Sequence, residues 1–267
     1  MSIIPEVTVL MCVRNGELFF EEALASILNQ SFGDFELLVV DDASEDSTPD
    51  MLDAVRDPRL RVVRNAQCLG VTRSLNVGLG LARGGLVARM DADDVSHPER
   101  LAMQVARMRA RPEVAVLATT IEAMDRHGKP LPPWREDLAC LDHAAIKAML
   151  PRENCVAHPS VMYRRDVVAQ RGYDPGLLVA QDYGLWLRLC SEGFIFDKLP
   201  EPLLRYRVHG SSATQKRKLS DERGIKASIR LKSRHLARRA KTLRLNAFDA
   251  RVAAHLAREL WAESRRK

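Results

Sequence analysis

Three carboxylates lie within four residues at Asp91-Ala92-Asp93-Asp94, directly after the apolar run 86–90. Carboxylates packed this closely repel one another, and a bound cation relieves that repulsion. Hard divalent ions prefer oxygen ligands, and Mg²⁺ typically combines one or two carboxylates with substrate phosphates. The cluster therefore predicts a Mn²⁺ or Mg²⁺ site at this position. The alternative is a solvated acidic turn in which Asp94 or Ser96 caps the next helix.

Two further positions could contact a nucleotide-like ligand. Asp41-Asp42 follows the apolar run 36–40, and one of its carboxylates could accept a hydrogen bond from a base or a ribose hydroxyl. An Asx turn or a helix cap is the alternative. Arg73 falls in the first turn of a predicted helix, where a cation opposes the helix dipole. A diphosphate or a nearby Asp would explain that position; otherwise Arg73 is an exposed surface arginine.

Asp182 and His209 are the remaining candidates for chemistry. Asp182 begins a predicted helix with an apolar face, where a carboxylate either caps the helix or acts as a general base in a cleft. Asp174 is the second candidate for the base. His209 follows a predicted strand at 202–205, so it could be a third metal ligand or hold a diphosphate. The alternative for His209 is a loop histidine on the surface.

Short apolar runs that alternate with helical patterns supply the scaffold for these side chains. The runs predicted as buried strands cover 7–13, 36–40, 60–64, 86–90 and 114–118. Ser96 and Glu99 have capping-box spacing ahead of the helix that follows the fourth strand. The alternation predicts an α/β fold with a mixed, mostly parallel sheet flanked by helices. Because ligands bind beyond the carboxyl ends of such strands, three segments should meet there: Cys12–Asn15, Asp41-Asp42 and Asp91–Asp94.

Composition and cysteine usage are those of an ordinary globular protein. The chain has 267 residues, 46% of them apolar and 28% charged, which is enough to bury a sizeable core. Five cysteines without a CxxC pair favour free thiols in a reducing compartment. The amino terminus has no signal-peptide pattern, and no window reaches the roughly 18 apolar residues of a membrane span. We therefore expect a cytoplasmic protein.

Charge is unevenly distributed along the chain. Residues 216–267 carry 17 Lys and Arg against 5 Asp and Glu, a charge of +12, which leaves −6 on residues 1–215 of a chain with a total of +6. We therefore divide the chain into an acidic α/β domain, 1–215, and a basic C-terminal helical extension, 216–267. The acidic domain, and the lack of interleaved aromatic residues in the extension, disfavour nucleic acid as a partner.

The extension predicts amphipathic helices. Its apolar residues at helical spacing are Ile225, Ile229, Leu236, Leu243, Leu245, Phe248, Val252, Leu256 and Leu260. Its basic residues between them are Lys226, Arg230, Lys232, Arg234, Arg238, Arg239, Lys241 and Arg244. We expect the apolar face to pack on the acidic domain or on a second subunit as a homodimer. We expect the basic face to contact an anionic membrane, which attracts basic amphipathic helices.

Six ordered blocks together resemble glycosyltransferase family 2, the inverting enzymes with the GT-A fold. The blocks are VTVLMCVRNG (7–16), ALASILNQSFGDFELLVVDDASEDST (23–48), GVTRSLNVGLGLARGGLVARMDADD (70–94), HPSVMYRRDVV (158–168), QDYGLWLRL (181–189) and LLRYRVHGSS (203–212). The resemblance covers about residues 5–212. It implies a nucleotide-sugar donor, a divalent metal at the DxD-type motif and an inverted product.

The resemblance also assigns roles to individual residues. Asp42 would contact the base or the ribose of the donor. Asp91 and Asp93 would be the DxD pair at the metal and diphosphate, and Asp94 would support them. Asp182 is the expected catalytic base.

Two departures from the family pattern alter the expected site. The usual Thr/Ser-x-Tyr-Asn after the first strand is here Cys12-Val13-Arg14-Asn15, so Cys12 and Asn15 would line a different base pocket. The usual Glu-Asp before the base helix is here Gln181-Asp182, which keeps the base but removes a neighbouring charge. We expect the metal and Arg73 to stabilise the leaving diphosphate.

A direct displacement inverts the sugar carbon and needs no protein nucleophile, and the sequence shows no defensible Ser-His-Asp or Cys-His arrangement. By resemblance, the acceptor is a saccharide or a lipid-linked molecule of bacterial surface polysaccharide or lipid-linked oligosaccharide synthesis, at the inner face of the membrane. One alternative is a non-catalytic nucleotide-sugar-binding protein of the same fold, which the intact acidic residues disfavour. Another is a metal-dependent nucleotidyltransferase, which usually has a Gly-rich loop where residues 13–16 contain one glycine.

Overall fold

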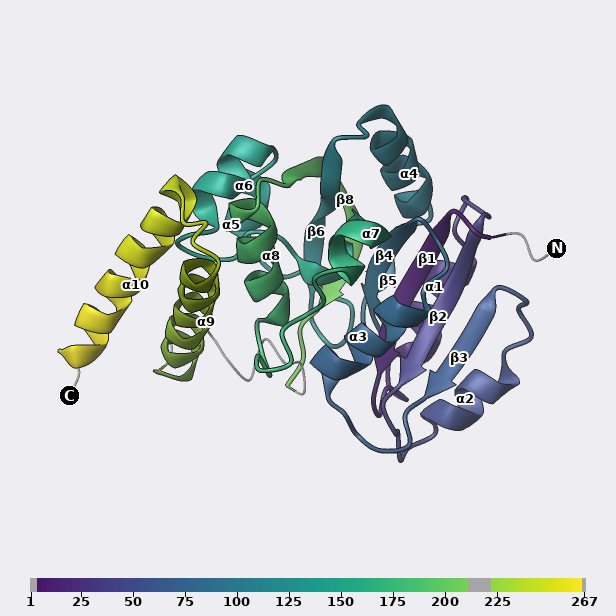
Figure 1. The fold of residues 1–267 in the computed structure, drawn as a ribbon. Helices are drawn as coiled ribbons and strands as arrows, with labels where there is room; N and C mark the ends of the chain where they lie inside the picture. The colour runs from purple at the N-terminus through teal and green to yellow at the C-terminus, as the bar shows by residue number, and fades with distance from the viewer. Residues whose placement is uncertain (1–3, 211–221, 266–267) are drawn as a thin grey trace.

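The computed structural model describes residues 4–210 and 222–265, and Figure 1 shows a central sheet flanked by helices. The sheet has eight strands in the order β3-β2-β1-β4-β7-β6-β8-β5. This architecture confirms the predicted α/β fold with a mixed, mostly parallel sheet. None of the helices in the described ranges is long and apolar enough to cross a membrane.

The first half of the sheet is parallel. Its strands are β1 (Val7–Val13), β2 (Phe35–Asp41), β3 (Leu60–Arg64) and β4 (Leu86–Asp91), with β1 between β2 and β4. Alternate residues of β1 face different cores: Val9 and Met11 pack in one apolar cluster and Leu10 in the other. Both faces of β1, β2 and β4 are therefore buried, which explains their nearly continuous apolar runs. The run 60–64, predicted as a buried strand, forms β3 at the edge of the sheet and is only half-buried.

The second half of the sheet is mixed. β7 (Met162–Arg164) runs antiparallel to β4 and to β6 (Val114–Met124), and β8 (Ile195–Arg207) runs parallel to β6. The short β5 (Val95–Ser96) follows the acidic cluster and pairs antiparallel with β8. The end of β8 is thereby brought beside the acidic cluster.

The helices connect and cover these strands. In chain order they are α1 (Phe20–Leu28), α2 (Thr48–Ala54), α3 (Val71–Leu81), α4 (Arg100–Ala110), α5 (Arg135–Ala139), α6 (His143–Met149), the 3₁₀ turn η1 (His158–Ser160), α7 (Arg165–Ala169), α8 (Gln181–Ser191), α9 (Glu222–Lys241) and α10 (Ala247–Ser264). α1 buries Phe20, Ala23, Leu24 and Ile27, which recur at the spacing of one helical face.

The capping box predicted at Ser96 and Glu99 is wrong. Ser96 belongs to β5, and α4 begins at Arg100 without a side-chain cap from Glu99. A residue distant in sequence serves this helix end instead, because the side-chain oxygen of Gln30 accepts the Leu101 backbone N–H at 3.0 Å. Spacing identified the helix correctly but could not show that a neighbouring element supplies the cap.

The basic extension forms α9 and α10, which lie beside α8 at the end of the molecule opposite β3 (Figure 1). The predicted domain boundary at 215/216 falls outside the described residues. The helical pattern breaks after Lys241, and Asn246 caps α10 in a capping box with Asp249.

The apolar stripe predicted for the extension is only partly correct. Phe248 and Val252 are buried as predicted, whereas Leu243 is 93% exposed, Leu245 58% and Leu260 47%. The stripe of α9 that is buried instead consists mainly of small or polar residues: Gly224, Ser228, Leu231, Lys232, His235 and Arg239.

Two basic residues assigned to a membrane-facing surface lie inside the protein, which corrects that part of the prediction. Lys232 is fully buried and pairs with Glu259 of α10. Arg239 is 7% exposed and pairs with Asp249 of α10. Buried charges require such partners, and the two carboxylates explain why the basic face turns inward here.

Candidate active site

The segments that follow β1, β2 and β4 meet at one edge of the sheet. Cys12 of β1 lies opposite Asp91 of β4, and Val13 lies opposite Asp41 of β2. The carboxyl ends of the three parallel strands are thus level with one another. This register brings together the three segments that the sequence placed beyond the strand ends.

The three carboxylates of Asp91, Asp93 and Asp94 form a compact cluster, with one oxygen of each lying within 4.8 Å of the others. Asp94 is fully buried, and its Oδ1 accepts the backbone N–H of Arg207 at 2.8 Å. Its Oδ2 is buried and has no hydrogen-bond partner among the described residues. Burial, together with the charges of Asp93 and Asp91, raises the pKa of Asp94 well above its usual value.

An unpaired buried carboxylate oxygen is costly unless positive charge stands beside it. Two other carboxylates crowd the same point, which increases the repulsion. An oxygen-rich set of this kind suits a hard divalent cation. The described residues therefore fit the metal that the sequence predicts.

The end of β8 holds the acidic cluster from one side. The Arg207 guanidinium donates from Nε to the Asp93 carbonyl at 2.7 Å, pairs with Glu22 of α1 and stacks over the Phe19 ring at 4.6 Å. His209 Nε2 lies 2.7 Å from Asp93 Oδ2. His209 is therefore adjacent to the cluster, where the sequence prediction needs it.

Arg89 of β4 lies beneath the cluster. Its side chain is 2% exposed and forms an ion pair with Asp91, although its Nε and Nη1 make no well-oriented hydrogen bond within the described part of the chain. Burial raises the pKa of Asp91, and the Arg89 charge opposes that effect. Arg89 thus supplies part of the positive charge that the crowded carboxylates require.

Asp182 is the second residue of α8. The helix begins directly after Ala180, whose φ of 53° is left-handed. Asp182 Oδ2 accepts a hydrogen bond from Asn154 Nδ2 at 3.0 Å. Burial raises the pKa of Asp182, although hydrogen bonds from Tyr183 and Asn154 oppose the rise. The charge of Asp182 in turn contributes to the raised pKa of Asp91, so the two carboxylates are close neighbours in the electrostatic sense.

Asp42 binds the loop that leads into α3. Its carboxylate accepts the backbone N–H groups of Leu69 and Gly70 and the side-chain amide of Asn65, each at 2.8 Å. The Cys68 thiol lies 3.5 Å from Asp42 Oδ2. Burial opposes the change, but these hydrogen bonds together hold the pKa of Asp42 below its usual value.

Asn15 joins the loops that follow β1 and β2. It has a left-handed φ of 53°, its side-chain oxygen accepts the Glu45 N–H at 2.8 Å, and its N–H donates to Ser44 Oγ at 3.0 Å. Cys12 lies on β1, opposite Asp91 of β4, and burial raises the pKa of its thiol to about 12. Its thiol therefore stays protonated at neutral pH.

Arg73 is exposed in the first turn of α3, and its guanidinium has no ion pair or hydrogen bond with any described residue. The nearby Asp that could have explained this cation is therefore not provided by the described part of the chain. An anion from solution remains the other explanation for its position.

Three residues of this edge were not singled out in the sequence: Arg89, Arg207 and Asn154. Arg89 had a signal, because an arginine inside the apolar run LVARM indicates a buried charge. Arg207 lies two residues before His209 in a block that was noted only for resemblance. Asn154 had no local signal, because its role depends on contact with α8.

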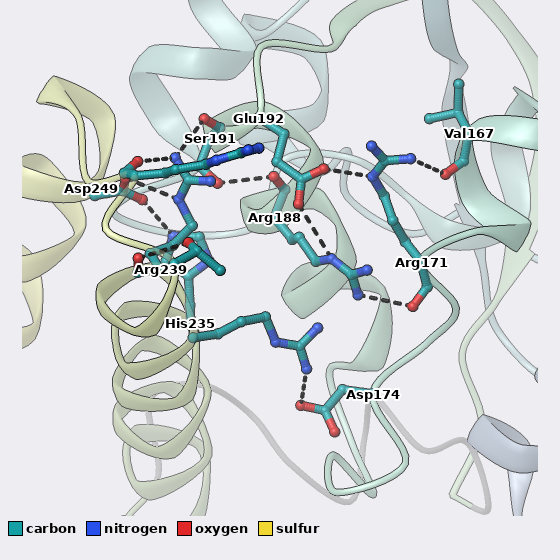
Figure 2. Close-up of polar contacts among 12 residues, drawn as sticks. Val167, Arg171, Asp174, Arg188, Ser191, Glu192, His235, Arg239 and Asp249 are labelled. Atoms are coloured by element: carbon teal, nitrogen blue, oxygen red, sulfur yellow. Dashed lines mark hydrogen bonds and ion pairs between the residues drawn. The ribbon is translucent and has the colours of Figure 1, made fainter.

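A second polar network fills the junction of α8, α9 and α10, as Figure 2 shows. The Asp249 carboxylate of α10 lies 2.8 Å from His235 Nε2 and accepts a hydrogen bond from Arg239 Nε at 3.2 Å. Arg239 also donates to the Ser191 carbonyl at 3.2 Å. Burial lowers the pKa of His235 even though Asp249 opposes that effect. This network therefore joins α9 to α10 and to the end of α8.

Asp174, the second candidate for the base, belongs to the network of α9. Its carboxylate accepts hydrogen bonds from Arg234 at 2.9 Å and from Arg238 at 3.1 Å. Burial opposes the change, but hydrogen bonding by Arg234 and the charges of both arginines hold its pKa below the usual value. These contacts favour Asp182 over Asp174 as the base.

A comparison with known proteins identifies the family. Residues 8–172 match the family described as Glycosyl transferase family 2. The chain is 32% identical over 226 residues to the O-antigen biosynthesis glycosyltransferase WbnJ of Escherichia coli, which covers 82% of this chain and 86% of the relative.

Two solved structures share the fold. S. aureus TarS 1-349 in complex with UDP-GlcNAc has a TM-score of 0.73 at 19% identity and covers 96% of this chain and 71% of that one. Mannosyltransferase PcManGT from Pyrobaculum calidifontis, in complex with GDP-Man and Mn²⁺, has a TM-score of 0.67 at 22% identity and covers 96% and 69%. With the fold, the acidic cluster and the family match taken together, the chain belongs to glycosyl transferase family 2 and is a glycosyltransferase with the GT-A fold.

Proposed function

We propose that the protein moves a sugar from a nucleotide-diphosphate-sugar donor to an acceptor hydroxyl, with inversion and with a divalent metal. The observation that carries this proposal is the cluster of Asp91, Asp93 and Asp94 at the carboxyl end of β4, whose oxygens suit a divalent cation. A base beside a cation-binding cluster suits a reaction in which a diphosphate leaves as a hydroxyl attacks.

We assign the metal, Mn²⁺ or Mg²⁺, to Asp91 and Asp93, with His209 as a third ligand beside Asp93. Asp94 supports the pair with its buried Oδ2, which has no hydrogen-bond partner in the described part of the chain. When bound, the metal would neutralise negative charge on the leaving diphosphate. Arg207 holds the cluster in position, because its guanidinium donates to the Asp93 carbonyl and its backbone N–H donates to the Asp94 carboxylate.

We assign the donor to the same edge of the sheet. The Arg73 guanidinium, which has no ion pair with any described residue, would bind the diphosphate. Asp42 would receive the base or the ribose in place of the Cys68 thiol, whose hydrogen bond of 3.5 Å to Asp42 is longer than the three of 2.8 Å. Cys12 and Asn15 would line the base pocket. In the related structures the nucleotides are those of UDP-GlcNAc and GDP-Man.

Asp182 would take the proton of the acceptor hydroxyl as it attacks the sugar carbon. Its raised pKa improves it as a proton acceptor, because a base works best when its pKa approaches the working pH. The Asn154 amide fixes the orientation of the carboxylate through its hydrogen bond to Oδ2. No protein nucleophile takes part in a single displacement.

We infer that the acceptor is a saccharide or a lipid-linked saccharide of bacterial surface polysaccharide synthesis. This inference rests on the similarity to WbnJ, a glycosyltransferase of O-antigen biosynthesis. It places the protein in the cytoplasm, at the inner face of the membrane where a lipid-linked acceptor would be reached.

We further propose peripheral membrane contact through the turn between α9 and α10. Leu243 and Leu245 are exposed there, and the basic Lys241 and Arg244 lie beside them. A basic residue near an anionic surface contributes about 1 kcal/mol. Replacement of Lys241 and Arg244 by Glu should abolish flotation with anionic vesicles, whereas unchanged flotation would contradict contact through this turn. A wild type that does not float would leave a homodimer through the exposed leucines as the alternative.

A panel of nucleotide sugars tests the enzymatic proposal. The purified protein should hydrolyse or transfer from at least one donor in the presence of Mn²⁺ or Mg²⁺. If a donor binds but is never consumed with any saccharide acceptor, the non-catalytic binding protein of this fold becomes the better account. Family membership already disfavours the nucleotidyltransferase alternative.

A further inference from the structure

The loop that contains Asn154 lies between α6 and η1 and is held by contacts from α8 and α9. From α8, the Tyr183 hydroxyl donates to the Leu150 carbonyl at 2.6 Å. From α9, Lys232 Nζ donates to the Arg152 carbonyl at 3.0 Å. Asn154, two residues further along, donates to Asp182. The loop therefore connects the C-terminal helices to the carboxylate that we propose as the base.

The orientation of Asn154 follows from its other hydrogen bond. Its Oδ1 accepts the backbone N–H of Val156 at 3.1 Å, so its Nδ2 must point away from that group. Nδ2 then donates to Asp182 Oδ2 at 3.0 Å. The position of the loop backbone therefore determines where the Asn154 amide holds the Asp182 carboxylate.

Lys232 is a charged residue inside the protein, at the contact between α9 and the loop that contains Asn154. Its side chain is fully buried, and its charge is balanced by Glu259 Oε1 at 2.6 Å. Ser228 donates to the same carboxylate at 3.0 Å and fixes it from α9. A buried lysine needs partners of this kind, and here one of those partners is the backbone of the loop that contains Asn154.

We propose that Lys232 is a positioning residue for sugar transfer: through the Arg152 carbonyl and the Asn154 amide it holds Asp182 in place, so that α9 and α10 complete the active site. This inference rests on the proposed role of Asp182. It gives the C-terminal helices a part in catalysis that is independent of membrane contact.

The molecule offers a matched control for this proposal. Arg239 lies on the same buried face of α9 and, like Lys232, pairs with a carboxylate of α10. Its other contacts are with the Ser191 and Arg244 carbonyls, not with the loop of Asn154. Lys232→Met and Arg239→Met therefore both disturb the docking of α9, but only the first releases the loop.

The test compares the two variants in kcat, in KM for the donor and in hydrogen exchange of the peptide covering 150–156. Lys232→Met should lower kcat about tenfold with little change in KM, because a small misplacement of a catalytic group slows the reaction. Exchange of the peptide should accelerate. Arg239→Met should keep a kcat near that of the wild type and leave that peptide protected. Should Lys232→Met fail to fold, Glu259→Gln is measured in its place, with a smaller decrease of kcat expected.

A double substitution separates positioning from packing. Adding Lys232→Met to Asn154→Ala should lower kcat no further than Asn154→Ala alone, because both act on Asp182 by one route. Equal losses of kcat in Lys232→Met and Arg239→Met, or a fully additive double variant, would overturn the proposal. If Asp182→Asn lowers kcat but Lys232→Met does not, only this inference fails. If Asp182→Asn itself retains turnover, the assignment of the base fails first.

Discussion

Buried charges occur at two places in this protein, and they are paired very differently. At the junction of α8, α9 and α10, Asp249 binds both His235 and Arg239. At the carboxyl edge of the sheet, the buried Asp94 keeps one oxygen without a partner among the described residues. Both regions hold carboxylates that are almost inaccessible to water, so burial alone does not distinguish them.

The difference lies in what completes each set of charges. The helix junction is complete within the protein, and its carboxylates stabilise the docking of the helices. At the edge of the sheet, the Asp94 oxygen without a partner among the described residues calls for an external positive charge. Pairing, more than burial or acidity, therefore indicates which region binds a ligand.

The largest expected effect is on kcat, and it should distinguish Asp182 at the edge of the sheet from Asp174, which contacts α9. Asp182→Asn should lower kcat by about 10²–10⁴-fold, the usual contribution of a general base, with donor binding little changed. Asp174→Asn, whose carboxylate is held by Arg234 and Arg238, should reduce kcat far less. Steady-state kinetics with separate titration of the donor measures both. Near-normal turnover by Asp182→Asn would move the base elsewhere.

Stability should respond in opposite directions in the two regions. Asp249→Ala leaves His235 and Arg239 without their shared partner, so the free energy of unfolding should fall by about 3–5 kcal/mol. Asp94→Asn removes a charge that Asp91 and Asp93 repel, so the protein in chelator should unfold at the same or a higher temperature. Thermal unfolding followed by circular dichroism compares them. A strong loss of stability in Asp94→Asn would contradict the distinction between the regions.

His209→Ala tests how far the metal site extends beyond the acidic cluster. If His209 is a ligand beside Asp93, the metal concentration for half-maximal activity should rise about tenfold, while activity at saturating metal recovers in large part. A titration of activity against Mn²⁺ gives the value. An unchanged metal dependence would assign His209 to the surface of the loop.

The pH dependence of kcat should show the buried environment of Asp182. Because burial raises its pKa in the folded protein, the carboxylate gains a proton at a higher pH than an exposed Asp, which titrates near 3.9. Activity should therefore fall on acidification while the pH is still above that value, and stability should not fall with it. A kcat that is constant down to pH 4 would show that a different group accepts the proton.

The strands and the acidic edge could be predicted because their signals are local. The five apolar runs gave the strands, and the position of Asp91 and Asp42 at strand ends placed both carboxylates at one edge. A parallel sheet brings the ends of its strands together, so short segments of sequence determine that part of the site.

The remaining contacts could not be predicted because they join segments far apart in the chain. Arg207 binds Asp94 across 113 residues, and Lys232 reaches the Arg152 carbonyl across 80. On α9 the predicted helical period was correct, but the buried face contains polar side chains. Lys232 and Arg239 can be buried there because Glu259 and Asp249 of α10 pair with them. A pattern of apolar residues contains no information on such partners.

Binding of Mn²⁺ tests the central claim most directly. Calorimetric titration of Mn²⁺ in the presence of a nucleoside diphosphate should show one site, weaker without the nucleotide because the diphosphate supplies part of the coordination shell. Asp91→Asn should abolish it, Asp249→Asn should leave it intact, and EDTA should abolish transfer until Mn²⁺ or Mg²⁺ is restored. Equal Mn²⁺ binding by wild type and Asp91→Asn, or full transfer activity in EDTA, would contradict the account.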